Sequence, residues 1–155
     1  MTDFDIRPVV ADDIPHLKTV LDETGLFPPD MLADLMTPAL SGETGEFWLA
    51  GCIAGVPVGL CYTKREELAE GAWNMLALGV RPACRRDGLG LALVKGAEAH
   101  LRTTGERLLI VETSGTEDFA AARAFYASAG YEREACIRDF WATGDDKIVF
   151  RKLLG

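Results

Sequence analysis

The segment from Val80 to Gly90 combines several features that bind an anion. Its residues run Val-Arg-Pro-Ala-Cys-Arg-Arg-Asp-Gly-Leu-Gly. The two glycines let the backbone approach a ligand and adopt positive φ, and a helix that starts there presents unpaired N–H groups and its positive dipole end. Because Arg81, Arg85 and Arg86 add positive charge, the segment predicts a pyrophosphate site, with an ordinary helix entry as the alternative. It matches neither standard nucleotide-binding fingerprint, Gly-x-Gly-x-x-Gly or Gly-Lys-Ser/Thr.

Two motifs resemble those of the GNAT-type N-acetyltransferases. The stretch 85–90 is similar to the acetyl-CoA loop of that family, Arg/Gln-x-x-Gly-x-Gly/Ala. The stretch 122–131 is similar to its segment Ala-x-x-Phe/Leu-Tyr-x-x-x-Gly-Phe/Tyr. The order of the expected strands and helices also fits, so the resemblance covers essentially the whole chain. One position departs from the pattern, since Phe119 stands where the family often has Asn.

The resemblance implies acetyl-CoA as cosubstrate, no metal, and a role for each matched residue. The strand end 78–80 would pair with the pantetheine arm, and the main-chain N–H groups of 85–91 would surround the pyrophosphate. Tyr126 would protonate the departing coenzyme A thiolate, although a packing aromatic is the other interpretation of this residue. The cofactor-binding residues implied are Leu78, Gly79, Val80, Arg85, Arg86, Asp87, Gly88, Leu89, Gly90 and Leu91.

Direct attack of an amine on the thioester requires a base for the ammonium group. Glu112 is the first candidate, because it follows four apolar residues at the end of a strand, where desolvation would raise its pKa toward about 7. A hydrogen-bonded structural glutamate is the alternative, and Glu70 and Asp139 are weaker candidates. His16 and His100 lie in amphipathic helices and are interpreted as surface or packing residues.

An acceptor pocket needs apolar walls, which aromatic side chains can supply. The candidates are Phe27, Trp73, Phe140 and Trp141, each with ordinary packing as the alternative. Lys95 and Arg123 could reach the 3′-phosphate of the cofactor, but both are interpreted as solvated helix surface.

Hydrophobic spacing predicts the elements that position these residues. We expect strands over 4–10, 47–53, 56–63, 73–80, 108–111, 131–140 and 147–153, and helices over 14–24, 30–36, 89–101 and 119–129. Pro38 should end the second helix at or before Thr37. The continuously apolar run 108–111 is typical of a strand buried on both faces. The expectation is an α/β domain over residues 1–155, with a GNAT-like, mostly antiparallel mixed sheet of six to seven strands and helices on both faces.

Composition restricts the partners. The 155 residues include 16 Lys and Arg against 24 Asp and Glu, a net charge of −8. This balance argues against nucleic acids and anionic membranes, and it favours cationic ligands, although acidity alone often serves only solubility. No apolar run is long enough to span a membrane and the N-terminus has no signal-peptide pattern, so we expect a cytoplasmic protein. Cys52 and Cys61 are expected as free thiols that face each other across a hairpin.

These observations predict an acetyl-CoA-dependent N-acetyltransferase that modifies a primary amine, most simply of a small cationic molecule. A protein N-terminal acetyltransferase is the alternative enzyme. A noncatalytic acyl-CoA sensor that keeps the cofactor loop is the alternative outside enzymes. The sequence leaves a homodimer open and does not name the acceptor, because function depends on the pocket rather than the fold.

Overall fold

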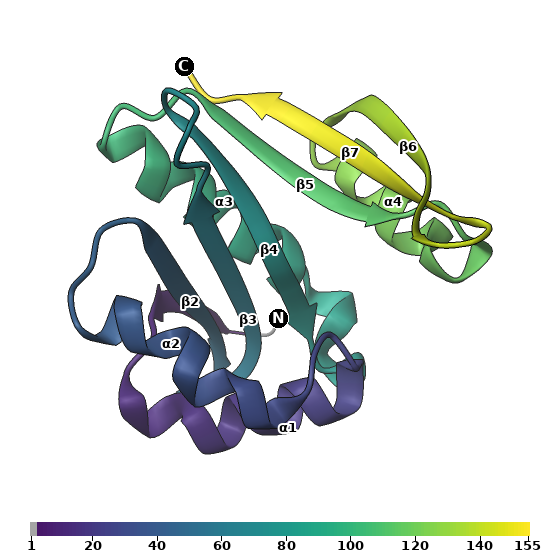
Figure 1. Cartoon of the computed structure of the whole chain (residues 1–155). Coiled ribbons are helices and arrows are strands. Elements are labelled where there is room, and N and C mark those ends of the chain that lie inside the picture. Colours follow the sequence, from purple (N-terminus) through teal and green to yellow (C-terminus); the bar gives the residue numbers. More distant parts are fainter. Residues whose placement is uncertain (1–2) are drawn as a thin grey trace. The chain divides into compact units, whose positions relative to one another are not determined.

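The computed structural model describes residues 3–155, except the side chain of Arg86. Its strands are β1 (Phe4–Pro8), β2 (Glu46–Ile53), β3 (Val56–Arg65), β4 (Ala72–Val80), β5 (Leu108–Ser114), β6 (Glu132–Ala142) and β7 (Asp145–Leu153). Its helices are α1 (Ile14–Thr24), α2 (Leu32–Leu40), α3 (Leu89–Thr103) and α4 (Ala120–Ser128) (Figure 1). The expected α/β class and the expected element order are therefore confirmed.

The strands form a seven-stranded sheet in the order β1-β2-β3-β4-β5-β7-β6. The pair β4–β5 is parallel, whereas β1–β2, β2–β3, β5–β7 and β6–β7 are antiparallel. This confirms the mostly antiparallel mixed sheet. The chain divides into two compact units: unit 1 contains the residues up to Arg65 and Leu76–His100, and unit 2 contains Glu66–Met75 and Leu101–Gly155.

Unit 1 has helices on both faces of its strands. Along β2, the side chains of Trp48, Ala50 and Cys52 belong to the apolar cluster formed with α1 and α2. The alternate residues Leu49 and Gly51 lie next to side chains of α3. This is the period of two that a strand imposes, and it separates the two helical layers of the unit (Figure 1).

Unit 2 contains the first half of β4 beside β5, followed by β7 and β6. Ala72–Met75 pair with Leu108–Val111, and each β5 residue from Leu108 to Ser114 has a partner in β7. The helix α4 contacts one face through rings, since Tyr126 lies 5.9 Å from Phe150 between ring centroids. Because Phe150 pairs with Val111, that face also carries the alternate β5 residues around Val111.

Two local expectations were wrong. The helix α2 continues past Pro38 to Leu40, because the missing N–H of Pro38 would have bonded only to the carbonyl of Asp34, which is on an exposed residue. The strand β5 is not buried on both faces. Leu109 and Val111 are buried, whereas Leu108 and Ile110 are half-buried on the other face.

The cysteines are free, as expected, but the pairing of β2 with β3 differs from the expected one at Cys52 and Cys61. Cys61 pairs with Leu49 and Cys52 with Pro57, so the two thiols do not face each other across the hairpin. Burial raises the pKa of the Cys61 thiol to about 12. A thiol with so high a pKa is a poor nucleophile at neutral pH.

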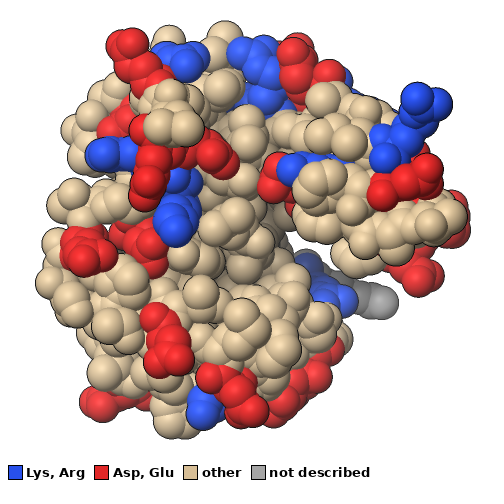
Figure 2. All heavy atoms as spheres, in the orientation of Figure 1, with Lys and Arg blue, Asp and Glu red and all other residues tan. Residues whose placement is uncertain are grey.

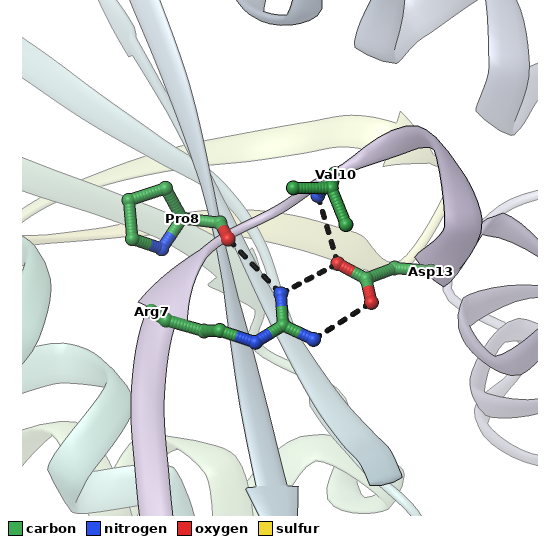
Figure 3. Close-up of polar contacts among 4 residues, drawn as sticks. All are labelled: Arg7, Pro8, Val10 and Asp13. Carbon is green, nitrogen blue, oxygen red and sulfur yellow. Dashed lines mark hydrogen bonds and ion pairs between the residues drawn. The ribbon is translucent and has the colours of Figure 1, made fainter. Parts of the chain in front are cut away.

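An ion pair fixes the entry to α1. The guanidinium of Arg7 donates to both carboxylate oxygens of Asp13 at 2.8 Å, and Asp13 Oδ2 also accepts from the backbone N–H of Val10 (Figure 3). The side chain of Asp13 is only 5% exposed. The Arg7 guanidinium therefore holds the pKa of Asp13 below its ordinary value of 3.8.

Replacing Asp13 with asparagine is expected to lower the free energy of unfolding by about 2–4 kcal/mol, less than for a fully buried pair because Arg7 is one-third exposed. A carboxyl with a lowered pKa in the folded state stabilises the protein above its unfolded-state pKa and loses this effect as pH falls. The difference between the parent and Asp13→Asn should thus shrink below about pH 4. Urea unfolding at several pH values measures it, with the exposed neighbour Asp12→Asn as control. Equal losses for both variants would contradict the assignment.

Candidate active site

The loop between β4 and α3 has the geometry of an anion site. It consists of a 3₁₀ helix, Pro82–Asp87, followed by Gly88 in the left-handed region at φ +81°, and α3 then begins at Leu89. A Cβ at Gly88 would meet no atom within 4 Å, so this glycine serves the backbone conformation rather than a close contact. The first N–H groups of α3 have no partner within the helix and are available to a ligand.

The positive charge of the loop is smaller than the sequence suggests. The guanidinium of Arg81 donates to both carboxylate oxygens of Glu23 on α1, at 3.0 and 2.9 Å. The Nε of Arg85 donates to the carbonyl of Val80 at 3.0 Å, which ties the loop to the end of β4. Arg81 is thus partly neutralised, and Arg85, which is exposed, keeps its charge at the loop. The side chain of Arg86 lies outside the described part of the structure.

A glycine on β2 anchors the start of α3. A Cβ added to Gly51 would lie 3.0–3.3 Å from three side-chain atoms of Leu89, a fully buried residue. The absence of a side chain at Gly51 therefore lets the first turn of α3 pack directly on the sheet. This contact positions Leu89, the first residue of α3, against β2.

Replacing Gly51 with alanine is expected to destabilise the protein by about 1–3 kcal/mol, the usual cost of overpacking a core. It should also weaken coenzyme A binding, because relieving this contact shifts Leu89, the first residue of α3. Chemical unfolding and calorimetric titration with coenzyme A measure the two effects. The control is Gly45→Ala, where an added Cβ meets nothing within 4 Å. An alanine at position 51 that changes neither quantity would remove this account of the loop.

The residues expected beside the pantetheine arm form the last three positions of β4. Val80 faces α3, since a Cβ on Gly59 of β3 would lie 3.2 Å from Val80 Cγ2 and 3.1 Å from Leu93 Cδ1. Gly79 faces the other way, and a Cβ there would lie 2.5 Å from Leu26 Cδ1. The two glycines allow β3, β4 and the segment after α1 to approach closely.

In unit 2, Glu112 lies in a polar cluster that the sequence did not predict. Its Oε1 accepts from Asn74 Nδ2 at 3.2 Å, and its Oε2 pairs with the ammonium of Lys147. Asn74 also donates to Glu66 Oε1 at 3.2 Å. The side chain of Glu112 is 21% exposed. Its carboxylate is therefore held at both oxygens and is still in reach of solvent.

Two aromatic rings flank this ion pair. The Nζ of Lys147 lies 4.2 Å from the ring centroid of Phe140 and 5.8 Å from that of Trp141. The register between β6 and β7 shifts between Ile137 and Ala142, where Asp139 has φ +55°. Such a bulge redirects side chains, and here it brings Phe140 and Trp141 to the Lys147–Glu112 pair.

Tyr126 lies on the opposite face of the unit 2 sheet from Glu112. Its ring packs against Phe125, Tyr131 and Phe150. Phe150 pairs with Val111, whereas Glu112 is the next residue along β5 and points to the other face. Tyr126 is half-buried, and its ring therefore has a packing role whether or not its hydroxyl takes part in the reaction.

The four aromatic residues expected to line an acceptor pocket lie in different environments. Phe27 belongs to unit 1, where its ring packs edge-on against Trp48, and Trp73 is 3% exposed on β4. Trp141 is 47% exposed and donates through Nε1 to the carbonyl of Thr113. Of the four aromatics, Phe140 and Trp141 are therefore the two that the structure brings to the Glu112 cluster.

The alternative bases have structural contacts. Asp139 Oδ1 accepts from the backbone N–H of Gly144 at 2.7 Å, which stabilises the β6–β7 turn. Glu70 is exposed, and its carbonyl accepts from Arg107. The Asp139 carboxylate is therefore held toward the turn backbone, and the contacts described for residues 3–155 include none to the carboxylate of Glu70.

The interpretation of Arg123 as solvated surface was wrong. Arg123 is half-buried, and its Nη1 donates to the carbonyls of Ser114 and Thr116 at 2.8 and 2.7 Å. It thus ties α4 to the end of β5. Lys95 is exposed, as expected, and the ring of His100 packs against Phe47 at 4.2 Å.

Asn74, Lys147 and Glu66 are the residues that sequence reasoning missed. Asn74 carried a signal, because it is a polar residue within the apolar run Ala-Trp-Asn-Met-Leu-Ala of β4. Its partners Glu66 and Glu112 could not be inferred, since they come from a loop and from β5 and depend on strand register. In residues 3–155 no group of three His, Cys, Asp or Glu side chains is arranged to hold a metal ion. The same residues include no helix of the length and apolarity that a membrane span requires.

Comparisons with known proteins give consistent results. The model of the acetyltransferase (GNAT) family matches residues 17–131. A GNAT-family protein from Desulfovibrio desulfuricans is 29% identical, with a TM-score of 0.91 over 99% of this chain and 100% of that one. The ribosomal-protein-S18-alanine N-acetyltransferase of Escherichia coli is 20% identical, with a TM-score of 0.80 over 99% and 95%. An aminoglycoside 6′-N-acetyltransferase complexed with coenzyme A is 15% identical, with a TM-score of 0.80 over 97% of each chain. No curated protein sequence matches the chain.

Proposed function

Because the chain belongs to the GNAT family of acetyltransferases, we propose that it transfers the acetyl group of acetyl-CoA to a primary amine of a small cationic molecule. The observation that carries this proposal is the loop between β4 and α3. There a left-handed glycine leads into the free N–H groups of a helix, beside the exposed Arg85. Such a helix start stabilises phosphate groups through hydrogen bonds and its dipole.

The loop residues fit a pyrophosphate in three ways. Gly88 leaves open space where other residues carry a side chain, Leu89 holds the helix start rigidly, and Arg85 supplies charge. We assign the whole stretch from Arg85 to Leu91 to the pyrophosphate, and the β4 end from Leu78 to Val80 to the arm of the cosubstrate. When bound, acetyl-CoA supplies an activated acyl group and a thiolate leaving group.

The residues of unit 2 then handle protons. Glu112 takes a proton from the acceptor ammonium, which becomes a neutral, nucleophilic amine. Tyr126 gives its hydroxyl proton to the departing sulfur.

Charge supports a cationic acceptor. The net charge is −8, and on the face drawn in Figure 2 acidic side chains are interspersed among the basic ones. An acidic surface attracts cations over roughly 10 Å at moderate salt. At Glu112, a carboxylate and two aromatic rings already surround one alkylammonium, that of Lys147. The same chemistry suits the ammonium group of an acceptor, with Phe140 and Trp141 as apolar walls.

The test is thiol release from acetyl-CoA with a panel of acceptors: a diamine, an amino sugar, an amino acid and a peptide with a free N-terminus. We expect the diamine or amino sugar to be acetylated fastest, with a KM that rises with salt concentration. Preference for the peptide would instead establish the N-terminal acetyltransferase. Coenzyme A binding without release on any acceptor would establish the acyl-CoA sensor.

A further inference from the structure

Asn74 is the polar side chain that stands out in β4. It is 5% exposed and lies between Trp73 and Met75, both buried. Burying an amide is unfavourable unless its hydrogen-bonding groups are satisfied. The contacts of Asn74 therefore indicate what a buried amide does at this position.

Both donors of the Asn74 amide serve carboxylates, while its acceptor is unsatisfied. Nδ2 lies 3.2 Å from Glu66 Oε1 and 3.2 Å from Glu112 Oε1. The buried Oδ1 has no hydrogen-bond partner in the described structure. A flipped amide would place its oxygen against two carboxylates, so the donors determine its orientation. This orientation of the amide satisfies the two carboxylates and leaves its own oxygen without a hydrogen-bond partner.

The result is that Glu112 is fixed at both oxygens. Asn74 holds Oε1 from β4, and Lys147 holds Oε2 from β7. Asn74 pairs with Ile110 in the parallel β4–β5 ladder, so Asn74 and Glu112 lie on the same face of the sheet, two β5 positions apart. We propose that Asn74 is the positioning residue of this reaction, holding Glu112 in the orientation in which it takes the proton of the acceptor ammonium.

This inference rests on the proposed function and on Glu112 as its base. In the step concerned, one proton moves from the acceptor nitrogen to a Glu112 oxygen, and no other bond changes. The titratable groups that face Glu112 are Glu66 from the loop after β3 and Lys147 from β7. Along the same face of β7 follow Asp145, which accepts from Ser114, and Arg151, which pairs with Glu132.

The test replaces Asn74 with leucine, which has a similar size and no donor. We expect kcat with the best acceptor of the panel to fall about 10–100-fold, since a misplaced reacting group by about 1 Å costs that much. The KM for acetyl-CoA should stay unchanged. Asn74→Ala provides the same loss of donors with less volume, should leucine prevent folding.

The control is Met75→Leu, a buried neighbour on the other face of β4, which should retain the kcat of the parent. The decisive comparison is made in a Glu112→Gln background, where Asn74→Leu should have little further effect because both changes act through one group. Full additivity of the two losses would overturn the positioning role while leaving the acetyltransferase intact. Absence of transfer by the parent enzyme would instead remove the proposed function itself.

Discussion

Replacing Tyr126 with phenylalanine is expected to lower kcat by about 10²–10⁴-fold, the usual contribution of a general acid. The variant keeps the ring, which packs against Phe125, Tyr131 and Phe150, so folding should be preserved. Only the proton for the coenzyme A sulfur is lost. The KM for acetyl-CoA should change little, because the hydroxyl acts on charge that develops during the reaction.

The matched control for this experiment is Tyr131→Phe. Tyr131 is a buried neighbour whose ring lies 6.3 Å from that of Tyr126, and it undergoes the same chemical change. Steady-state kinetics of thiol release compares the two variants. A Tyr126→Phe enzyme that stays within about twofold of the parent would show that the hydroxyl has no acid role.

Replacing Glu112 with glutamine is expected to lower kcat at neutral pH by a similar factor of about 10²–10⁴. Glutamine has a similar size and one acceptor oxygen, so it keeps one of the two contacts to Asn74 and Lys147 and loses its basicity. The pH–rate profile should flatten, and part of the rate should return at high pH, where more of the acceptor amine is already neutral. Kinetics over a pH series with the same acceptor measures both effects.

Lys147 separates a catalytic role of Glu112 from a structural one. Lys147→Met removes the ion pair and leaves the carboxylate, so turnover should persist. A structural ion pair without a catalytic role would give equal losses for Lys147→Met and Glu112→Gln. The exposed Glu134 on β6 offers Glu134→Gln as a charge-matched control that should behave as the parent.

Local chemistry made part of the fold and the site predictable. The turn at Ala54 and Gly55, the end of α1 at Gly25 and the start of α3 beyond Gly88 all occur where glycine supplies a positive φ. The cofactor loop belongs to this class, because its ligands would be backbone N–H groups whose arrangement follows from strand, glycine and helix in succession. Such features depend on residues close together in the sequence.

Register and burial decided the rest. The sequence placed Glu112 at a strand end, but its partners Asn74 and Lys147 come from positions 38 and 35 residues away, and only the pairing of β4, β5 and β7 brings them together. Pro38 lies inside α2 because the carbonyl that it leaves without an N–H donor belongs to Asp34, an exposed residue. Tertiary structure also decided the charge of the loop. Glu23 on α1 lies 58 positions before Arg81 in the sequence and pairs with that arginine.

The sequence by itself thus determined the element order, the glycine-containing loop before α3 and the pair of motifs that identifies the family. Tertiary structure decided which carboxylate is held at both oxygens, which aromatic rings accompany it, and that Tyr126 and Glu112 occupy opposite faces of their sheet. The physical reason is that backbone conformation is set by neighbours along the chain, whereas a side chain's partners are set by strand register, and a shift of one residue would move every side chain of β5 to the other face.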